Sequence, residues 1–461
     1  MADWAVWMAG AMVRELALFA AVGFLIGGLD DLLIDALWLA HAARRRWRAR
    51  GRAGLGAGPG PSRRPGRIAV FVPAWDEGAV IGAMLACACR RWAGGDVAIY
   101  VGCYPNDPAT GAAVAAAAAR DPRVRPVPCS RAGPTTKADC LNHLWRALVA
   151  DEAAHGRRAK AVVLHDAEDV VHAGELALFD RLIDDFAMVQ LPVVPLVDRR
   201  SLWGRLVSGH YVDEFAEAHG KQLVVRGAVG AAVPSAGVGC AIARDAIQRI
   251  ADAAGGAPFD PGSLTEDYEI GFKIAASRGR AIFVRRVADD GSLIAVAEHF
   301  PALLRDAVRQ KARWMNGIAL SGWDRIGWQG GIADRWMLLR DRRALIGAVV
   351  LSAAHVALGL WLAGLAAALA GFGSIDAGVP AWLILTNLGL LGWRVVVRAG
   401  FTAAGHGWRF AAGVPLRMLV ANLIEMLAAL HALGSYLRGR REGRVTWEKT
   451  AHRFPELGFG G

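Results

Sequence analysis

Charged residues are scarce in this sequence of 461 residues, at 21% of the chain, against roughly 25% in an average soluble protein. Apolar residues, glycine not counted, make up 54%. These proportions exclude a disordered chain, a coiled coil and a solvated repeat array, and they favour a soluble domain joined to membrane segments. The net charge of +11 is compatible with nucleic acid, an anionic membrane surface or a phosphorylated substrate as partner.

Cysteine is also sparse, and its spacing argues against a zinc site. The six cysteines form no CxxC pair, and no histidine cluster accompanies them. We expect reduced thiols of a cytosolic domain at Cys87, Cys89, Cys103, Cys129, Cys140 and Cys240.

Charge is absent from two long stretches of the chain. Leu16–Leu29 carries none, and Glu15–Ala43 as one helix is long enough to span a bilayer. Ala344–Phe372 has no charge apart from a possible one on a histidine and predicts a second span, and Ala381–Val397 predicts a third. Three carboxylates interrupt the first helix, and we expect them to face protein or water: Asp30, Asp31 and Asp35.

The arginine distribution predicts the orientation of these spans. Nine arginines and no acid lie between Arg44 and Arg67, whereas the loop 373–380 has no lysine or arginine. The positive-inside rule therefore puts the region after residue 44 in the cytoplasm, and the N-terminus and this loop outside. The apolar stretch 413–437 is interrupted by polar residues, so we expect it at the membrane interface. Because the basic clusters follow membrane boundaries and no nucleic-acid-binding motif accompanies them, we exclude nucleic acid as a partner.

These patterns divide the chain into five parts. They are an N-terminal transmembrane helix with its basic flank (1–50), a flexible linker rich in Gly and Pro (51–66), a cytoplasmic domain (67–340), two transmembrane helices (341–400), and a membrane-proximal helix with a cytoplasmic tail (401–461).

In the soluble domain, short apolar runs alternate with helical segments. This order predicts an α/β fold with a mainly parallel sheet covered by helices on both faces. Pro126 places its strand at an edge, and Asp213 and Glu214 are expected on a solvated helix face. The expected strands are Ile68–Val72, Val97–Val101, Val124–Val127, Ala161–Leu164 and Met188–Val194.

Carboxylates follow three of these strands. Because ligands of such sheets bind at the carboxyl ends of the strands, these side chains are candidates for one shared site. Hard cations such as Mg²⁺ or Mn²⁺ take oxygen ligands, and a bound cation would in turn hold phosphates. Alternatively, single acids here are solvated or cap the next helix. The residues are Asp76 and Glu77 after the first strand, Asn106 and Asp107 after the second, and Asp166 and Glu168 after the fourth.

The soluble domain resembles the inverting family 2 glycosyltransferases with the GT-A fold. The matching motifs, in chain order, are Pro73-Ala74-Trp75-Asp76-Glu77, Asp166-Ala167-Glu168, Thr265-Glu266-Asp267 and Gln310-Lys311-Ala312-Arg313-Trp314. Further segments resemble the bacteriophage adsorption protein B type of transferase: Leu29–Leu32, Tyr104–Asp107, Pro134–Lys137, Pro234–Gly239 and Trp447–His452. The sequence departs from the family at Glu168, which replaces an Asp, and at Asn106-Asp107, where many relatives have two Asp; both changes keep an oxygen donor.

This resemblance implies roles for the motif residues. Asp166 and Glu168 bind Mg²⁺ or Mn²⁺, Arg313 contacts the donor diphosphate, and Asp267 beside Glu266 is the general base. Gln310 and Trp314 complete the catalytic set, with Trp314 offering a flat face to a sugar. The expected nucleotide-binding residues are Pro73, Trp75, Asp76, Glu77, Asn106, Asp107, Lys137 and Asp166.

Simpler roles stay open for three of these positions. Lys137 could merely begin a helix. Trp314 could be an interfacial anchor. Thr265 could cap a helix over Tyr268–Ala276, which is compatible with a catalytic Asp267.

The expected protein is a multi-pass enzyme of a bacterial inner membrane with its catalytic domain in the cytoplasm. It would move sugar from a nucleotide-sugar donor, expected to be UDP-linked, to a glycan acceptor, and could extend a polysaccharide for export with an outer-membrane partner. Two alternatives remain: transfer of one sugar to a lipid-linked acceptor, and an inactive membrane scaffold or phage-adsorption factor. Because few residues follow Lys449–Pro455, we also expect a catalytic core without its own regulatory domain.

Overall fold

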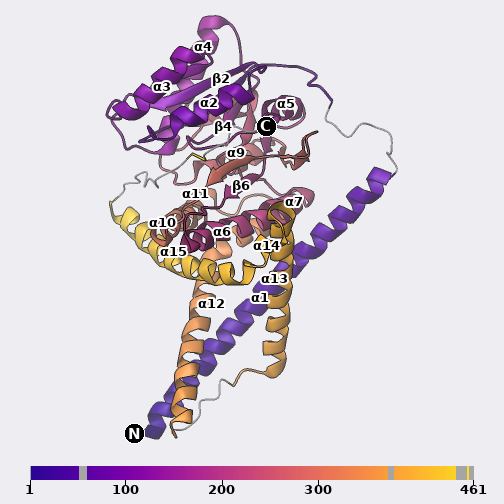
Figure 1. Ribbon diagram of the computed structural model, residues 1–461, viewed down its shortest axis with the longest axis vertical. Helices are drawn as coiled ribbons and strands as arrows, with labels where there is room; N and C mark the ends of the chain where they lie inside the picture. The colour runs from indigo at the N-terminus through magenta and orange to yellow at the C-terminus, as the bar shows by residue number, and fades with distance from the viewer. Residues whose placement is uncertain (1, 51–59, 372–377, 443–453, 456–461) are drawn as a thin grey trace.

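The computed structural model describes residues 2–50, 60–371, 378–442 and 454–455. Figure 1 shows an α/β body from which long helices extend in one direction. Most of the predicted linker 51–66, most of the loop 373–380 and all of the Trp447–His452 motif lie outside the described residues.

A seven-stranded sheet forms the centre of the body. The strands stand in the order β3-β2-β1-β4-β7-β5-β8. Only β7, which lies between β4 and β5, is antiparallel to both of its neighbours, so the predicted mainly parallel sheet is confirmed, with the Pro126 strand at its edge. The bounds are β1 Ile68–Pro73, β2 Val97–Cys103, β3 Val124–Pro128, β4 Ala161–Leu164, β5 Met188–Gln190, β7 Cys240–Ala243 and β8 Ala281–Phe283.

Helices cover both faces of this sheet, as its apolar strands require. Alternate residues of β1 enter two separate cores: Val70 packs into one and Phe71 into the other. The first core is shared with α2 Ile81–Arg91, α3 Pro108–Arg120 and α5 Glu175–Leu182, and the second with α4 Lys137–His155, α8 Arg244–Ala253 and α9 Glu266–Ala276.

The single strand expected over Met188–Val194 is wrong. The chain leaves the main sheet at Pro192, which has no N–H to continue the ladder. The segment after it, β6 (Val193–Leu196), pairs in parallel with β11 (Val296–His299) in a separate sheet. This displacement brings β11 to the edge of the cleft described below. A further small hairpin joins β9 Arg286–Val287 and β10 Leu293–Ile294.

A layer of helices connects the α/β body to the long helices. It contains three elements from the middle of the chain, three that follow β11, and two near the C-terminus. They are α6 Leu202–Glu217, η1 Ala218–Gln222, α7 Leu223–Ala228; α10 Leu304–Met315, η2 Asn316–Leu320, α11 Ser321–Ile326; and α14 Trp408–Ala411, α15 Val414–Glu442.

Among the residues that the structure describes, four helices are long and apolar enough to cross a membrane: Trp7–Trp47, Ile332–Leu369, Ala381–His406 and Val414–Arg441. The first three lie in α1 (Ala2–Arg50), α12 (Ile332–Leu369) and α13 (Ala381–His406), which extend away from the body in Figure 1. α15 instead runs crosswise to α12 and α13, underneath the body. An interfacial position for the 413–437 stretch stays our prediction.

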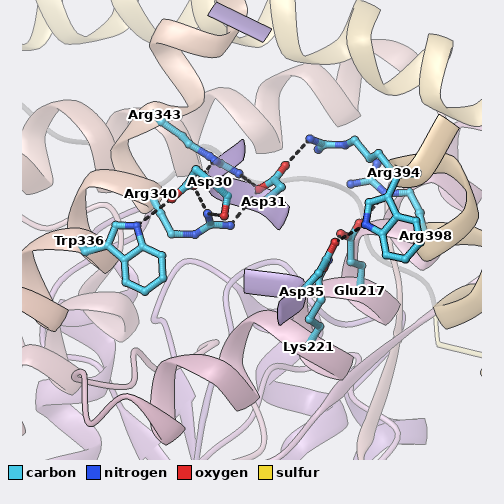
Figure 2. Close-up of polar contacts among 11 residues, drawn as sticks. Asp30, Asp31, Asp35, Glu217, Lys221, Trp336, Arg340, Arg343, Arg394 and Arg398 are labelled. Carbon is cyan, nitrogen blue, oxygen red and sulfur yellow. Dashed lines mark hydrogen bonds and ion pairs between the residues drawn. The ribbon is translucent and has the colours of Figure 1, made fainter. Parts of the chain in front are cut away.

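The carboxylates of α1 face protein, as predicted. Figure 2 shows Asp30 and Asp31 pointing at arginines of α12 and α13, and Asp35 pointing at Lys221. Asp31 lies 2.5 Å from Arg343 and 2.7 Å from Arg394. Pairing in this way lowers the cost of holding acids in an apolar helix.

The expectation of a solvated face at Asp213 and Glu214 is wrong. Asp213 is buried and receives two hydrogen bonds from Arg417 of α15, at 2.7 and 2.8 Å. Glu214 pairs with Lys311 of α10. The partners lie far away in the sequence, so the local amphipathic pattern did not reveal them.

Candidate active site

A solvent-open cleft at the carboxyl ends of β1 and β4 brings most of the sequence-predicted site residues together. The empty space within it, including the part open to solvent, is about 970 Å³. Ten of the fourteen predicted residues line it: Pro73, Glu77, Lys137, Asp166, Glu168, Glu266, Asp267, Gln310, Arg313 and Trp314.

Asp166 and Glu168 sit on the loop after β4, next to a lysine. Lys137, the first residue of α4, places its Nζ 2.6 Å from Asp166 Oδ1. Burial opposes the charged amine, but the carboxylates of Asp166 and Glu266 outweigh it and raise the pKa of Lys137. Lys137 is therefore a fixed positive charge inside the cleft.

The donor set of this loop fits a divalent cation that is bound together with a phosphorylated ligand. Within the ranges that the structure describes, no cluster of three or more His, Cys, Asp or Glu could cage a metal. Mg²⁺ usually takes one or two carboxylates, with water and substrate phosphates filling its other positions. Asp166 and Glu168 supply such a pair in the cleft.

A buried triad of ionisable side chains contacts the loop that carries Asp166. His165 lies between two carboxylates, with Nδ1 2.7 Å from Asp169 and Nε2 2.6 Å from Glu175, and all three side chains are fully buried. Burial opposes the imidazolium, but Glu175 and Asp169 raise the pKa of His165 to about 10. Asp169 also accepts a hydrogen bond from the backbone N–H of Asp166, at 3.0 Å. The triad thus fixes the loop, and sequence reasoning missed it.

Glu266 and Asp267 occupy the first turn of α9. Asp267 Oδ1 accepts a hydrogen bond from the Tyr268 N–H at 2.7 Å. Burial raises the pKa of Asp267 although Lys137 opposes this, and burial together with Asp267 raises the pKa of Glu266 to about 7. A carboxylate with a raised pKa is a stronger proton acceptor.

Thr265 holds the N-cap position of α9, but its side chain makes no cap hydrogen bond. The hydroxyl is buried and has no hydrogen-bond partner among the described residues. The expectation that the Thr265 side chain caps the helix is therefore wrong, although Thr265 does directly precede the helix.

α10 presents Gln310, Arg313 and Trp314 to the cleft. The Trp314 ring packs edge-on to Tyr211 and Phe300, with centroids 6.2 and 6.3 Å apart. This cluster continues into α15.

A buried lysine ties α10 to its neighbours. Lys311 pairs with Glu214 of α6 and lies 3.1 Å from Glu425 of α15. The position of α10 thus depends on the crosswise helix.

Four predicted nucleotide-binding residues lie outside the lining of the cleft. Asp107 caps α3 and accepts the Asp76 N–H at 2.5 Å. The Asn106 amide makes two hydrogen bonds to the Gly133 backbone, at 2.7 and 2.8 Å. Trp75 packs edge-on against Tyr104. Their contact with a nucleotide stays a prediction.

The cleft also contains residues that sequence reasoning missed. Glu298 and Phe300 line it from β11 and the residues just after it. Glu298 gave one weak signal, an acid within a short apolar run. Ser263 and Thr136 also line the cleft.

Gly237 leaves the space that the Asp267 carboxylate occupies. A Cβ there would lie 2.2 Å from Asp267 Oδ2, and the φ of +83° disfavours any other residue. We expect Gly237→Ala to displace Asp267 and to slow catalysis about 10²-fold, the effect of a misplacement near 1 Å. Gly230→Ala is the matched control, because Gly230 has a φ of +77° and nothing within 4 Å. Equal losses in both variants would mean that backbone strain, not the Asp267 contact, is responsible.

Comparison with known proteins identifies the family. Residues 65–317 match glycosyltransferase like family 2. The chain is 36% identical over 487 aligned positions to bacteriophage adsorption protein B of Escherichia coli K12, and equally to bacteriophage N4 adsorption protein B of E. coli O157:H7. Each alignment covers 99% of this chain and 64% of the relative, so the chain spans less than two thirds of their length.

Among solved structures, the fold is similar to that of mannosyltransferase PcManGT from Pyrobaculum calidifontis in complex with GDP-Man and Mn²⁺. The TM-score is 0.50 and the identity 18%, covering 88% of this chain and 99% of that one. Both the motifs and the fold agree with the family match: the chain belongs to glycosyltransferase family 2 and has the GT-A fold, joined to helices apolar enough to cross a membrane.

Proposed function

We propose that this chain is an inverting glycosyltransferase that moves a sugar from a nucleotide-sugar donor to an acceptor hydroxyl. The observation that carries the proposal is that one cleft gathers Asp166, Glu168, Asp267 and Arg313. These groups are the ones that a diphosphate leaving group and an unactivated hydroxyl require.

The leaving diphosphate is the first chemical problem. Lys137 and Arg313 present positive charge, and the planar guanidinium can bind phosphate oxygens in two places. Asp166 and Glu168 would hold Mg²⁺ or Mn²⁺, which supplies further charge neutralisation when bound. The triad at His165 keeps this loop in place.

The acceptor hydroxyl is the second problem. Asp267 would take its proton, and the raised pKa of this carboxylate suits that task. Trp314 and Phe300 offer apolar surface to a sugar ring. Because α15 packs under this part of the cleft, we propose an acceptor delivered from the membrane side.

We further propose a multi-pass protein of a bacterial inner membrane with the α/β body in the cytoplasm. The arginine-rich flank after residue 44 and the absence of lysine and arginine from 373–380 support this orientation. A growing glycan exported through an outer-membrane partner is the first candidate product, and a single sugar on a lipid carrier is the second.

A donor panel tests the proposal. Membranes containing the protein are incubated with labelled UDP- and GDP-sugars and Mg²⁺ or Mn²⁺, and released nucleotide and labelled product are measured. Labelled product in the polymer fraction would indicate a glycan acceptor, and labelled product in the lipid fraction would indicate a lipid-linked acceptor. No donor-dependent nucleotide release with any donor would favour the inactive scaffold.

Transfer should require a divalent cation. We expect excess EDTA to abolish it, and Glu168→Gln to weaken activation by Mn²⁺ at least about tenfold, because the cation would lose one of its two protein carboxylates. Asp289→Asn, at an exposed acid away from the cleft, is the control. Full turnover in EDTA would contradict the metal assignment.

Arg313→Ala should impair both donor binding and rate. Loss of a hydrogen bond to a charged group corresponds to about 10–10²-fold in kcat/KM, and we expect KM to rise and kcat to fall. Arg309→Ala, an exposed arginine on the same helix, should change neither. An unchanged KM for the donor would show that Arg313 does not bind the diphosphate.

A further inference from the structure

A second pocket lies between the start of α6, α14 and the start of α15. Its empty space, including the part open to solvent, is about 490 Å³, and it shares no lining residue with the cleft. Three arginines and no carboxylate line it, together with apolar side chains and a glycine: Leu202, Arg205, Leu206, Arg409, Phe410, Gly413 and Arg417.

Arg417 is the buried centre of this pocket, with 4% of its surface exposed. Its Nε and one terminal nitrogen bind Asp213, and Nη2 also donates to the Phe410 carbonyl at 3.0 Å. The guanidinium stacks over the Phe410 ring, 4.1 Å from its centroid.

The other terminal nitrogen of Arg417 remains for a ligand. Nη1 makes no hydrogen bond within the described part of the chain. It lies beside Gly413, where a Cβ would come within 2.6 Å of it. The absence of a Cβ at Gly413 therefore leaves room for this buried donor, and both residues line the pocket.

Arg205 and Arg409 add two more positive charges. Both are exposed and form no ion pair with any residue that the structure describes. With Asp213 balancing Arg417, the pocket keeps a net charge of about +2. Guanidinium groups arranged in this way are suited to phosphate oxygens.

The pocket lies where the long helices meet the body. α13 ends at His406, and the chain then turns through α14 into the crosswise α15 (Figure 1). Two tryptophans near the pocket, Trp203 and Trp408, are 47% and 72% exposed, and Leu202 is 73% exposed. Exposed tryptophan beside apolar and cationic side chains is typical of the headgroup level of a bilayer.

We propose that this pocket binds the phosphate-bearing headgroup of an anionic membrane lipid. The three arginines bind the phosphate, and Leu202, Leu206 and Phe410 contact the glycerol and the first part of the acyl chains. Basic pockets between membrane helices on the cytoplasmic side bind lipid headgroups in this way. Because Arg417 also holds Asp213 of α6, a bound lipid would fasten α15 against the body. The proposal is independent of the sugar chemistry.

The test measures binding of soluble short-chain lipids to the full chain in detergent by native mass spectrometry. The probes are dioctanoyl-phosphatidylglycerol, dioctanoyl-phosphatidylcholine and inorganic phosphate. The variant Arg205→Gln/Arg409→Gln removes two exposed arginines whose side chains make no hydrogen bond or ion pair with the residues that the structure describes, so we expect the fold to be retained. The matched control is Arg438→Gln/Arg440→Gln, which removes the same charge from the far end of α15.

We expect saturable binding of the phosphatidylglycerol, weakened about tenfold to thirtyfold in the pocket variant and unchanged in the control. Phosphatidylcholine, which has no net charge, should bind more weakly. Equal binding to wild type and pocket variant, or equal loss in both variants, would overturn the proposal. Full displacement by inorganic phosphate at comparable concentration would assign the pocket to a soluble phosphate instead and overturn the lipid assignment.

Discussion

Asp267→Asn should lower sugar transfer by about 10²–10⁴-fold, the usual contribution of a general base, while donor binding changes little. In the proposed mechanism, Asp267 would contact the acceptor hydroxyl, whereas other groups would hold the nucleotide. The amide oxygen can still accept the Tyr268 N–H that Asp267 Oδ1 accepts at 2.7 Å. The start of α9 should therefore be preserved, and the loss can be attributed to chemistry.

Single-turnover transfer and equilibrium donor binding separate these effects. Glu266→Gln is the informative comparison, because Glu266 is adjacent, also lines the cleft and also has a raised pKa. We expect Glu266→Gln to lower the rate of sugar transfer less than Asp267→Asn does. A larger loss in Glu266→Gln would make Glu266 the base, and normal transfer by Asp267→Asn would remove Asp267 from the mechanism.

The sheet could be predicted from the sequence because its strands are buried on both faces. Residues such as Val70 and Phe71 enter opposite cores, so the strands appear as continuous apolar runs. The same signal failed at Pro192, since the apolar pattern continues on both sides of the proline while the chain changes sheets. Hydrophobicity reports burial and does not say which sheet a residue joins.

The site could be predicted where chemistry follows a strand end or a short motif. Asp166, Asp267 and Arg313 belong to such segments and share the cleft. Contacts between distant segments could not be predicted: Glu298 reaches the cleft through the pairing of β11 with β6, and Asp213 is buried by an arginine 204 positions later. The local sequence around Glu298 and Asp213 does not indicate which distant segments these residues contact.

The acids of α1 show the same limit and lead to a second large effect. Burial against protein could be predicted for Asp31, but its partners could not. Oδ1 accepts from Arg340 at 3.1 Å and from Arg343 at 2.5 Å, and Oδ2 accepts from Arg394 at 2.7 Å. One carboxylate therefore joins α1 to both α12 and α13 (Figure 2).

Asp31→Asn should destabilise the folded protein strongly. An amide has one acceptor oxygen, and its NH₂ group would face a guanidinium, so α12 and α13 could no longer share this residue. Removing one partner of a buried ion pair costs about 3–5 kcal/mol. Arg394 and Arg343 keep 44% and 32% of their side-chain surface exposed, so we expect the lower end of this range.

The measurement is the midpoint of thermal unfolding of the full chain in detergent or nanodiscs. Glu15→Gln, at an exposed acid of the same helix, is the matched control and should leave the midpoint unchanged. The double variant Asp31→Asn/Arg394→Gln should be less destabilised than the sum of its single changes, because the second substitution removes a charge that the first leaves unpaired. Equal midpoints for Asp31→Asn and Glu15→Gln would show that the Asp31 carboxylate does not contribute to holding the three helices together. Additive losses in the double variant would show that Asp31 and Arg394 do not act as a pair.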